Sequence, residues 1–202
     1  MTRVFLASRN PKKLHELRRI LAAAVPDVEV LGLDDVAAYG EPAETEETFE
    51  GNALIKARAG AAATGLPSLA DDSGICIDAL NGMPGVLSAR WAGRARDDAA
   101  NNALVLEQLS GIPPHRRGAE FRCAVALCLP SGREAVTYGV LRGRVLTEMR
   151  GSSGFGYDVI FAPEGAARTT AQMSDEEKDA ISHRGHALRA LAPTVAAELL
   201  DL

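Results

Sequence analysis

Apolar and polar positions follow one another along the first third of the chain in patterns typical of strands and helices. Residues 4–7 are a short apolar run that predicts a buried strand, and residues 28–31 predict a second strand. Between them, Asn10 is a favourable N-cap residue and Pro11 suits the first helical position, so a helix should begin there. Its apolar residues recur every three or four positions: Leu14, Leu17 and Leu21.

A second helix is predicted from near Thr45 to about Ala63. Small and apolar residues mark its packed face: Phe49, Ala53, Ala57 and Gly60. The strand-like segment 69–78 follows, and two adjacent carboxylates, Asp71 and Asp72, interrupt it before a Ser-Gly pair. Two interpretations are open. The strand ends in paired acids at the floor of a metal-dependent hydrolytic site, or it leads into an ordinary Asx turn.

The second half of the chain continues the alternation of strands and helices. The predicted elements are a helix from Asp97 or Asp98 to Leu109, strands at 121–129 and 134–146, a short strand at 159–161, a short helix opened by a capping box at Ser174, and a final helix after residues 181–186. The two longer strands should form a hairpin, and residues 151–158 a glycine-rich loop. This order indicates the α/β class. No linker is long enough to divide the chain, so one domain over residues 1–202 is expected.

Composition places the chain among ordinary globular proteins. Of its 202 residues, 47% are hydrophobic and 24% charged, which suffices for one substantial core. The net charge of −5 argues against a nucleic-acid-binding protein, which is usually basic. No apolar run approaches the roughly 20 residues that span a bilayer, and no secretory signal is recognisable, so a cytoplasmic protein without membrane association is expected. Three cysteines fit reduced thiols better than a disulfide framework.

Two groups of polar residues fit either a solvated surface or a binding site. Lys12 and Lys13 occupy the first turn of a predicted helix, where cations are disfavoured unless an anion such as phosphate binds there. Exposed lysines also tolerate so small a penalty. Thr48, Asn52 and Lys56 are spaced four apart on one helix face. They form a solvated stripe, or Lys56 points into a site and Asn52 steadies it.

The polar clusters together indicate a substrate class. Carboxylates such as Asp72 supply the oxygen ligands that Mg²⁺ prefers, while Lys and Arg side chains neutralise phosphate oxygens. Phe155 and Tyr157 lie on the glycine-rich loop and could hold a flat base, although they could also pack against the edge of a core. A nucleoside triphosphate hydrolysed with Mg²⁺ is the substrate that this combination implies.

Short motifs in a specific order extend over nearly the whole chain. They are Ser8-Arg-Asn-Pro-Lys-Lys13, Thr48-Phe-Glu-Gly-Asn-Ala53 with Lys56, Ala70-Asp-Asp-Ser-Gly74, Met83-Pro-Gly85, Ser88-Ala-Arg90, Gly154-Phe-Gly-Tyr-Asp158, Glu177-Lys178 and Ser182-His-Arg184. On this ordered set the chain resembles the inosine triphosphate pyrophosphatases, which hydrolyse deaminated purine nucleoside triphosphates to monophosphate and pyrophosphate. The resemblance implies an elongated α/β fold of two lobes, with helices on both sides of a central mixed sheet that floors an active-site cleft, and usually a homodimer.

The resemblance also implies roles for individual residues. Asp72 corresponds to the catalytic acid, assigned as proton acceptor and Mg²⁺ ligand, and Lys56 assists it at the phosphates. Glu44 is the expected second metal ligand, with Glu47 as the alternative, and the role of Asp71 stays open. The residues expected to grip the triphosphate are Ser8, Arg9, Asn10, Pro11, Lys12 and Lys13. Those expected to contact the rest of the nucleotide are Ser73, Phe155, Gly156, Tyr157, Asp158, Lys178, His183 and Arg184.

The expected reaction is attack of water on the α-phosphorus, with pyrophosphate leaving. Arg184 or a backbone N–H aimed at the 6-oxo group of inosine or xanthosine would disfavour adenine, which carries a donor there. For His183 and Arg184 the alternative is an exposed helix start. The chain departs from the family pattern at Gly51, where an acid is common, and at Val159, where Pro is usual. Two other functions stay open: a pyrophosphatase for pyrimidine or other modified nucleotides, and a non-catalytic nucleotide sensor.

Overall fold

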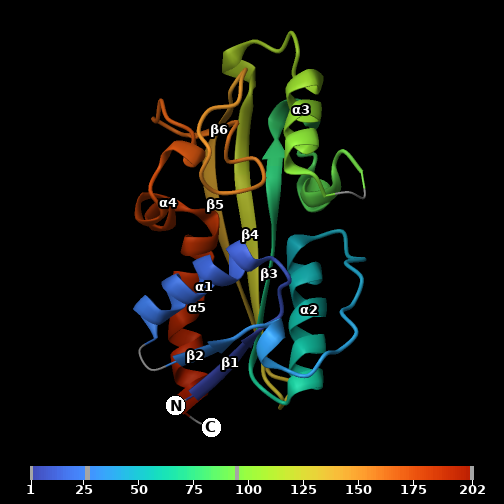
Figure 1. Cartoon of the computed structure of the whole chain (residues 1–202), viewed down its shortest axis with the longest axis vertical. Coiled ribbons are helices and arrows are strands. Elements are labelled where there is room, and N and C mark those ends of the chain that lie inside the picture. Colours follow the sequence, from blue (N-terminus) through green and yellow to red (C-terminus); the bar gives the residue numbers. More distant parts are fainter. Residues whose placement is uncertain (1, 26–27, 94–95, 201–202) are drawn as a thin grey trace. The chain divides into compact units, whose positions relative to one another are not determined.

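The computed structural model describes residues 2–25, 28–93 and 96–200 (Figure 1). A six-stranded sheet has the order β2-β1-β3-β4-β5-β6. The strands are β1 (Thr2–Leu6), β2 (Val28–Leu31), β3 (Ser68–Ile77), β4 (Gly118–Cys128), β5 (Glu134–Val145) and β6 (Phe161–Pro163). The helices are α1 (Pro11–Ala24), α2 (Phe49–Thr64), α3 (Asp98–Gln108), α4 (Asp175–Ile181) and α5 (His183–Leu200). Strands and α-helices alternate up to α3, after which β4, β5 and β6 follow one another and then α4 and α5. The predicted α/β class is confirmed.

The described chain forms two compact units. The first unit comprises the described residues up to 72, residues 123–139 and those from 184 onward; the second comprises 73–122 and 140–183. Three strands, β3, β4 and β5, each run from one unit into the other. The cleft and the homodimer implied by the family resemblance stay predictions.

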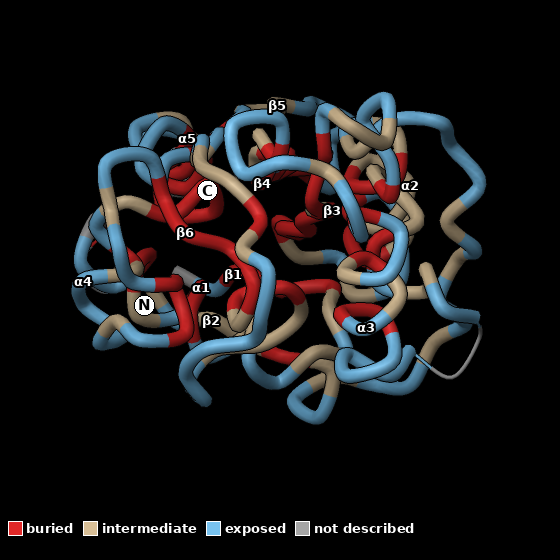
Figure 2. The backbone as a smooth tube through the Cα atoms, turned by 90° about the horizontal axis from the view of Figure 1, so that it is seen from above, coloured by how far each residue is buried: buried red, intermediate tan, exposed pale blue. Residues whose placement is uncertain are grey.

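Strand alternation builds the two cores of the first unit. β1 pairs in parallel with both β2 and β3, and its successive side chains point to opposite faces of the sheet. Val4 and Leu6 face one core together with apolar residues of α1 and α5, whereas Phe5 faces a second core lined by the alanines of α2. Helices therefore cover both faces of the sheet in this unit (Figure 1). Val4, Phe5 and Leu6 of β1 are buried as a result, and β3 is buried except for the half-buried Ser73 (Figure 2).

The second unit has a core of its own. Ile75 and Ile77 of β3 pack with Val105 and Leu109 of α3. Phe121 of β4 and Phe161 of β6 contact each other with ring centroids 4.5 Å apart. β6 pairs antiparallel with β5, which places Phe161 opposite Val145. These contacts fix the frame from which the glycine-rich loop projects.

Several predicted boundaries are confirmed. The side chain of Asn10 caps α1 and accepts hydrogen bonds from the backbone N–H groups of Lys12 and Lys13. β4 and β5 are consecutive neighbours in the sheet, as the hairpin prediction requires. Ser174 caps α4 in a capping box with Glu177.

β4 begins at Gly118 and α5 at His183, each earlier than predicted, and two further boundaries are wrong for local reasons. α2 begins at Phe49, not near Thr45, because Thr48 acts as the N-cap and accepts a hydrogen bond from Gly51 N–H at 3.1 Å. The last strand begins at Phe161, two residues later than predicted, because a turn brings Ile160 N–H onto the Tyr157 carbonyl at 3.1 Å.

The paired acids lie inside a strand and not at its end. β3 continues through Asp71, Asp72 and Ser73 to Ile77, so both the strand-end and the Asx-turn interpretations are wrong. Gly74 allows this continuation beside the 3₁₀ segment η3 (Gly85–Arg90). A Cβ atom on Gly74 would stand 2.4 Å from both the Gly85 carbonyl oxygen and Ser88 Oγ. The glycine here serves close packing, not a turn.

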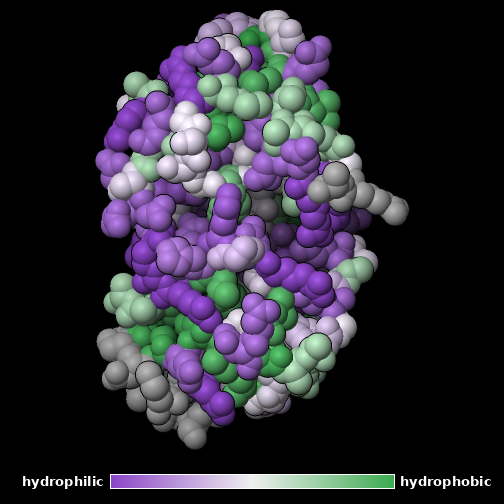
Figure 3. All heavy atoms as spheres, viewed as in Figure 1, coloured by the Kyte–Doolittle hydropathy of each residue, from purple (hydrophilic) through white to green (hydrophobic). Residues whose placement is uncertain are grey.

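The surface and the cysteines of the structure match what the composition predicts. Hydrophilic residues cover most of the face seen in Figure 3. Among the described residues, no helix is long and apolar enough to cross a membrane. Cys76, Cys123 and Cys128 are buried and free of disulfides, as predicted.

Candidate active site

Asp71 and Asp72 are neighbours in β3 but point to opposite faces of the sheet in the first unit. Leu69 packs in the core under α1 and α5, and Ala70 packs in the core under α2. The strand period of two therefore sends Asp71 to the α1/α5 face and Asp72 to the α2 face. The two carboxylates therefore contact different side chains, and their pKa values are shifted in opposite directions.

Asp71 is the centre of a buried ion-pair cluster. Its Oδ2 lies 2.9 Å from Lys13 Nζ and 3.1 Å from Arg184 Nε, and its side chain is 0% exposed. Arg184 also donates from Nη1 to Glu16 of α1. Burial would raise the pKa of Asp71, but the charges of Lys13 and Arg184 outweigh it and hold that pKa well below its usual range. Asp71 is therefore a permanent carboxylate that binds cationic side chains.

Asp72 contacts two side chains of α2. Asn52 Nδ2 donates to Asp72 Oδ2 at 3.2 Å, and Lys56 Nζ lies 3.8 Å from Asp72 Oδ1. Burial raises the pKa of Asp72, helped by the nearby charges of Glu44 and Asp71, although Lys56 opposes the shift. Asp72 thus has a higher affinity for a proton than an ordinary aspartate. This carboxylate is also partly accessible, with its side chain 10% exposed.

Lys56 joins the acids of this face. Its Nζ donates to Glu44 Oε1 at 2.8 Å and to the Asp71 carbonyl oxygen at 2.7 Å. Burial alone would lower the pKa of Lys56, but the charges of Asp72, Asp71 and Glu44 raise it overall. Lys56 therefore stays cationic. The prediction that Asn52 steadies Lys56 is corrected, because Asn52 bonds to Asp72 and to the backbone of Glu46.

The donor set on this face fits a Mg²⁺ ion. The carboxylates of Glu44 and Asp72 converge on one ammonium group, so both can reach a single cation. Mg²⁺ is typically held by one or two carboxylates together with water and substrate phosphates. Among the described residues, no group of three or more His, Cys, Asp or Glu side chains could hold a metal ion. Glu47, the alternative ligand, is exposed.

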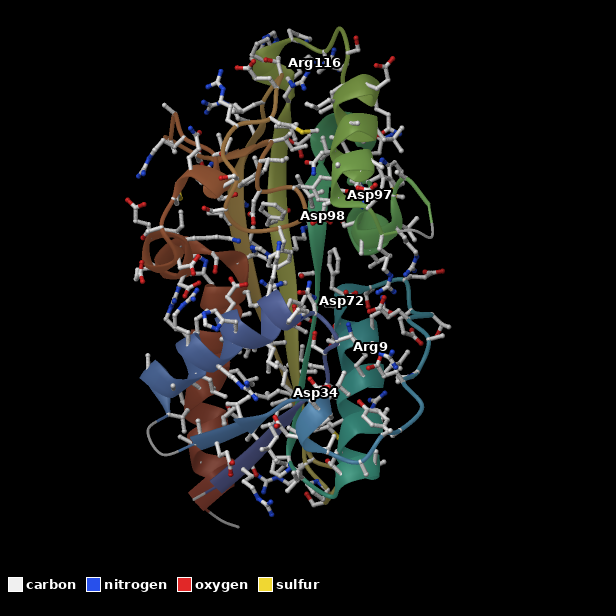
Figure 4. All side chains as sticks on the ribbon, in the orientation of Figure 1. Arg9, Asp34, Asp72, Asp97, Asp98 and Arg116 are labelled. Atoms are coloured by element: carbon white, nitrogen blue, oxygen red, sulfur yellow. The ribbon has the colours of Figure 1, made fainter. Side chains whose placement is uncertain are left out.

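The segment Ser8–Lys13 leads from β1 into α1. Ser8 Oγ accepts from Asn10 N–H at 3.3 Å, and Asn10 in turn caps the helix that starts at Pro11. Arg9 is exposed and pairs with Glu41 at 2.7 Å (Figure 4). The side chain of Lys13 reaches Asp71. The unfavourable position of Lys13 in the first turn of α1 is explained by its pairing with the buried carboxylate of Asp71.

A second polar cluster lies in the second unit, around the glycine-rich loop. Asp158 accepts hydrogen bonds from Phe155 N–H at 2.9 Å, from Lys178 Nζ at 2.7 Å and from Thr170 Oγ1 at 2.8 Å. The ammonium of Lys178 lies 5.1 Å from the centre of the Phe155 ring. Gly154 has φ +76°, and a Cβ there would stand 2.2 Å from Asp158 Oδ2. Only glycine fits this turn.

The two aromatics of the loop differ in exposure. Tyr157 is 4% exposed, packs in the core of the second unit and donates its hydroxyl to the Ser88 carbonyl at 2.8 Å. Burial raises the pKa of Tyr157 far above its ordinary value, so the hydroxyl stays a donor. Phe155 is half-buried, beside Lys178. The alternative of core packing therefore holds for Tyr157, and Phe155 is the ring available to a ligand.

Comparisons with known proteins identify the family of this chain. A model of the Ham1 family matches residues 4–194. The chain belongs to the Ham1 family. It is 59% identical over 198 residues to a dITP/XTP pyrophosphatase of Nocardia farcinica, covering 98% of this chain and 96% of that one.

Two solved structures resemble this Ham1-family chain over nearly their full length. A nucleoside-triphosphatase, dITP/XTP pyrophosphatase, from Mycobacterium abscessus has a TM-score of 0.77 at 56% identity, covering 95% of this chain and 100% of that one. A HAM1 protein from Coxiella burnetii has a TM-score of 0.87 at 40% identity, covering 98% and 100%. The family resemblance inferred from the ordered motifs is confirmed.

The last motif of this Ham1-family chain is buried, so the alternative of an exposed helix start is wrong. The His183 ring stacks on Phe121 with centroids 4.9 Å apart and planes 14° from parallel. Arg184 is 1% exposed and lies between Asp71 and Glu16. The guanidinium of Arg184 binds these two carboxylates. Its position does not support the predicted contact with the purine base of the nucleotide. Ser73, also predicted to contact substrate, is half-buried in β3.

Sequence reasoning missed several residues that position the site. Glu16 follows Lys13 by three residues on α1, a spacing that could have identified it as a partner on the same face. Asp98 and Asn102 of α3 bond to the backbone of Gly156. Asn102 occupies a buried position of a helix, and a buried amide almost always has a specific partner. The position of Asn102 in the helix pattern could have marked it as a buried amide. The pattern could not show that its partner is the Gly156 carbonyl.

Proposed function

We propose that this chain is a Mg²⁺-dependent nucleoside triphosphate pyrophosphatase that acts on ITP, dITP and XTP. The observation that carries the proposal is the division of labour between adjacent aspartates, with Asp72 beside Lys56 and Glu44 and Asp71 bound by Lys13 and Arg184. The names of relatives that are 52–60% identical over nearly the whole chain support the substrate class. The reaction yields a nucleoside monophosphate and pyrophosphate.

The first-unit cluster would serve the phosphates. Glu44 and Asp72 would hold Mg²⁺, which when bound neutralises phosphate oxygens and lowers the pKa of water. Lys56 stays cationic beside them and would stabilise the negative charge that develops as the α–β phosphoanhydride bond breaks. Asp72 would also orient the attacking water and accept its proton, the role that the family resemblance implies for it. Asp71 would hold Lys13 and Arg184 in place without contacting the reacting atoms.

The second-unit cluster would serve the base. Phe155 offers a half-buried ring, and Lys178 lies over it with an ammonium that can donate to a 6-oxo group. Inosine and xanthosine present an acceptor at that position, whereas adenosine presents a donor. A site built to donate there leaves adenine unpaired, which can give strong discrimination. In this proposal Lys178 replaces Arg184 as the donor, because Arg184 is committed to Asp71 and Glu16.

The proposal extends to the role of the protein in the cell. Removal of deaminated purine triphosphates would cleanse the nucleotide pool and keep these bases out of DNA and RNA. We expect a homodimer, as the family resemblance implies, and a cytoplasmic location. Size-exclusion chromatography with light scattering would measure the mass of the protein in solution. A mass of about 21.3 kDa, that of one chain, would contradict the dimer.

A triphosphate panel tests the function. ITP, dITP, XTP, GTP, ATP and dTTP are each incubated with the chain and Mg²⁺, and the release of pyrophosphate and orthophosphate is measured separately. We expect pyrophosphate from the first three at much higher kcat/KM than from the others. Comparable rates on dITP and dTTP would contradict the deaminated-purine specificity. Tight nucleotide binding without turnover would contradict the enzymatic function.

A further inference from the structure

Two residues of α3 hold the backbone of the glycine-rich loop at a single point. Asp98 Oδ2 accepts a hydrogen bond from Gly156 N–H at 2.7 Å. Asn102 Nδ2 donates to the Gly156 carbonyl at 2.8 Å. Asp98 and Asn102 lie one helical turn apart on α3, and Figure 4 shows Asp98 at the start of that helix. Both hydrogen-bonding groups of Gly156 are therefore bound by the same helix.

This clamp fixes the two peptide planes that flank Gly156. The N–H of Gly156 belongs to the plane shared with Phe155, and its carbonyl belongs to the plane shared with Tyr157. Asn102 is 1% exposed and donates its second amide proton to the Asp98 carbonyl at 2.7 Å, which ties the two clamp residues together. A buried amide with both protons donated cannot rotate without loss of a hydrogen bond.

The loop has further contacts on both sides of Gly156. Ser153 N–H donates to the Ala171 carbonyl, Tyr157 donates to the Ser88 carbonyl, and the Asp158 carboxylate accepts from Lys178 and Thr170. Phe155 N–H donates to the Asp158 carboxylate, and the Phe155 carbonyl accepts from Asp158 N–H at 3.3 Å. The peptide plane between Phe155 and Gly156 is thus held by Asp158 at its carbonyl and by Asp98 at its N–H, so Asp98 contributes to the direction of the Phe155 ring relative to Lys178.

We infer that Asp98 and Asn102 are specificity-determining positioning residues for the base end of the nucleotide. They act through Gly156 on Phe155 and do not contact the substrate. The inference rests on the proposed function of the loop as the base-holding element. It predicts that the clamp affects recognition of the base and leaves recognition of the triphosphate unchanged.

The chain offers a matched control on the same helix. Asn101 is 2% exposed, accepts from Ala92 N–H at 2.7 Å and donates to the Ala89 carbonyl at 3.3 Å. Its side chain is of the same type and as buried as that of Asn102, but it holds a different segment. Loss of Asn101 should lower stability about as much as loss of Asn102, without the effect on base recognition.

The test compares Asp98→Ala, Asp98→Asn, Asn102→Ala and Asn101→Ala with the parent protein. Steady-state kinetics are measured with dITP and dGTP, and inorganic tripolyphosphate, which has no base, is used as a competitive inhibitor. We expect Asp98→Ala and Asn102→Ala to raise KM for dITP about tenfold, the effect of losing one hydrogen bond to a charged or buried group. We expect kcat and inhibition by tripolyphosphate to change by less than about threefold, with a smaller preference for dITP over dGTP. Asp98→Asn keeps an oxygen acceptor and should restore KM.

Two results would overturn the inference. One is an unchanged KM and dITP preference in both alanine variants. The other is an equal loss of dITP and tripolyphosphate affinity, which would indicate general disruption of the fold. Calorimetric binding of dITP separates this inference from the proposed function. If the parent protein binds dITP without releasing pyrophosphate, the function fails, and a Kd raised about tenfold in Asp98→Ala still supports the clamp; an unchanged Kd overturns it.

Discussion

The ammonium of Lys13 lies 2.9 Å from Asp71 Oδ2, in a cluster that buries the Asp71 side chain completely. Asp72, the next residue of the strand, faces Lys56 and Asn52 instead. One strand thus delivers two neighbouring acids to opposite faces and gives them opposite properties. The pKa of Asp71 is lowered by two cations, and that of Asp72 is raised by burial. The first acid organises the site, and the second is suited to exchange a proton.

Replacement of Asp71 by alanine should strongly destabilise the protein. Removal of this acid leaves the charges of Lys13 and Arg184 only partly compensated by Glu16, and breaking a buried ion pair typically costs about 3–5 kcal/mol. Urea denaturation at neutral pH measures the free energy of unfolding. The control is Asp34→Ala, which removes an exposed aspartate of the first unit and should change this free energy by less than about 0.5 kcal/mol. Equal stability of the two variants would contradict the role of Asp71.

The depressed pKa of Asp71 predicts a loss of stability in acid. The folded protein holds Asp71 ionised at pH values where the unfolded chain protonates it, so the unfolded state binds more protons. The contribution of Asp71 is therefore full above the unfolded pKa of about 3.9 and decreases as the pH falls toward the folded value. The free energy of unfolding is measured for the parent and for Asp71→Asn between neutral and acid pH, with a chelator in the buffer. The two values should converge as the pH drops. Parallel curves would argue against this linkage.

Replacement of Asp72 by asparagine should abolish most of the turnover. The amide keeps the shape of the side chain but cannot take a proton, and loss of a general base typically costs about 10²–10⁴-fold in rate. KM for dITP should change little, because the phosphate and base contacts stay in place. Asp34→Asn serves as the matched control and should keep full activity. A kcat within a few-fold of the parent would remove Asp72 from the mechanism.

Glu44 and Glu47 can be separated as metal ligands by their response to Mg²⁺. A chelator should abolish pyrophosphate release, and added Mg²⁺ should restore it. Glu44 shares the ammonium of Lys56 with Asp72, so Glu44→Gln should raise the Mg²⁺ concentration for half-maximal activity by about tenfold or more. Glu47→Gln changes an exposed residue and should leave that concentration unaltered. The reverse pattern would move the metal site to Glu47.

Local rules were sufficient for much of the fold. The Asn-Pro pair that starts α1 and the capping box that starts α4 depend on neighbours in sequence, and both were predicted at their observed positions. The apolar alternation in β1 and β4 gave strands with two buried faces. These features depend on hydrogen bonds and side-chain periodicity within a few residues. They can therefore be predicted from the sequence of this chain alone.

The central site depended on contacts that no local pattern reveals. Adjacent aspartates before Ser-Gly are typical of a turn, and the strand continues through them because cations from α1 and α5 neutralise Asp71. Arg184 lies 113 positions from Asp71 in the chain, so its pairing could not be read from spacing. The clamp of Asp98 and Asn102 on Gly156 was missed for the same reason. Tertiary charge pairing and buried amides decided these positions.

The position of bond cleavage tests the account most directly. Hydrolysis of dITP by the parent protein in ¹⁸O-labelled water, with Mg²⁺ present, allows mass spectrometry of both products. Attack of water on the α-phosphorus predicts ¹⁸O in deoxyinosine monophosphate and unlabelled pyrophosphate. Label in the pyrophosphate, or release of orthophosphate in its place, would contradict the proposed reaction.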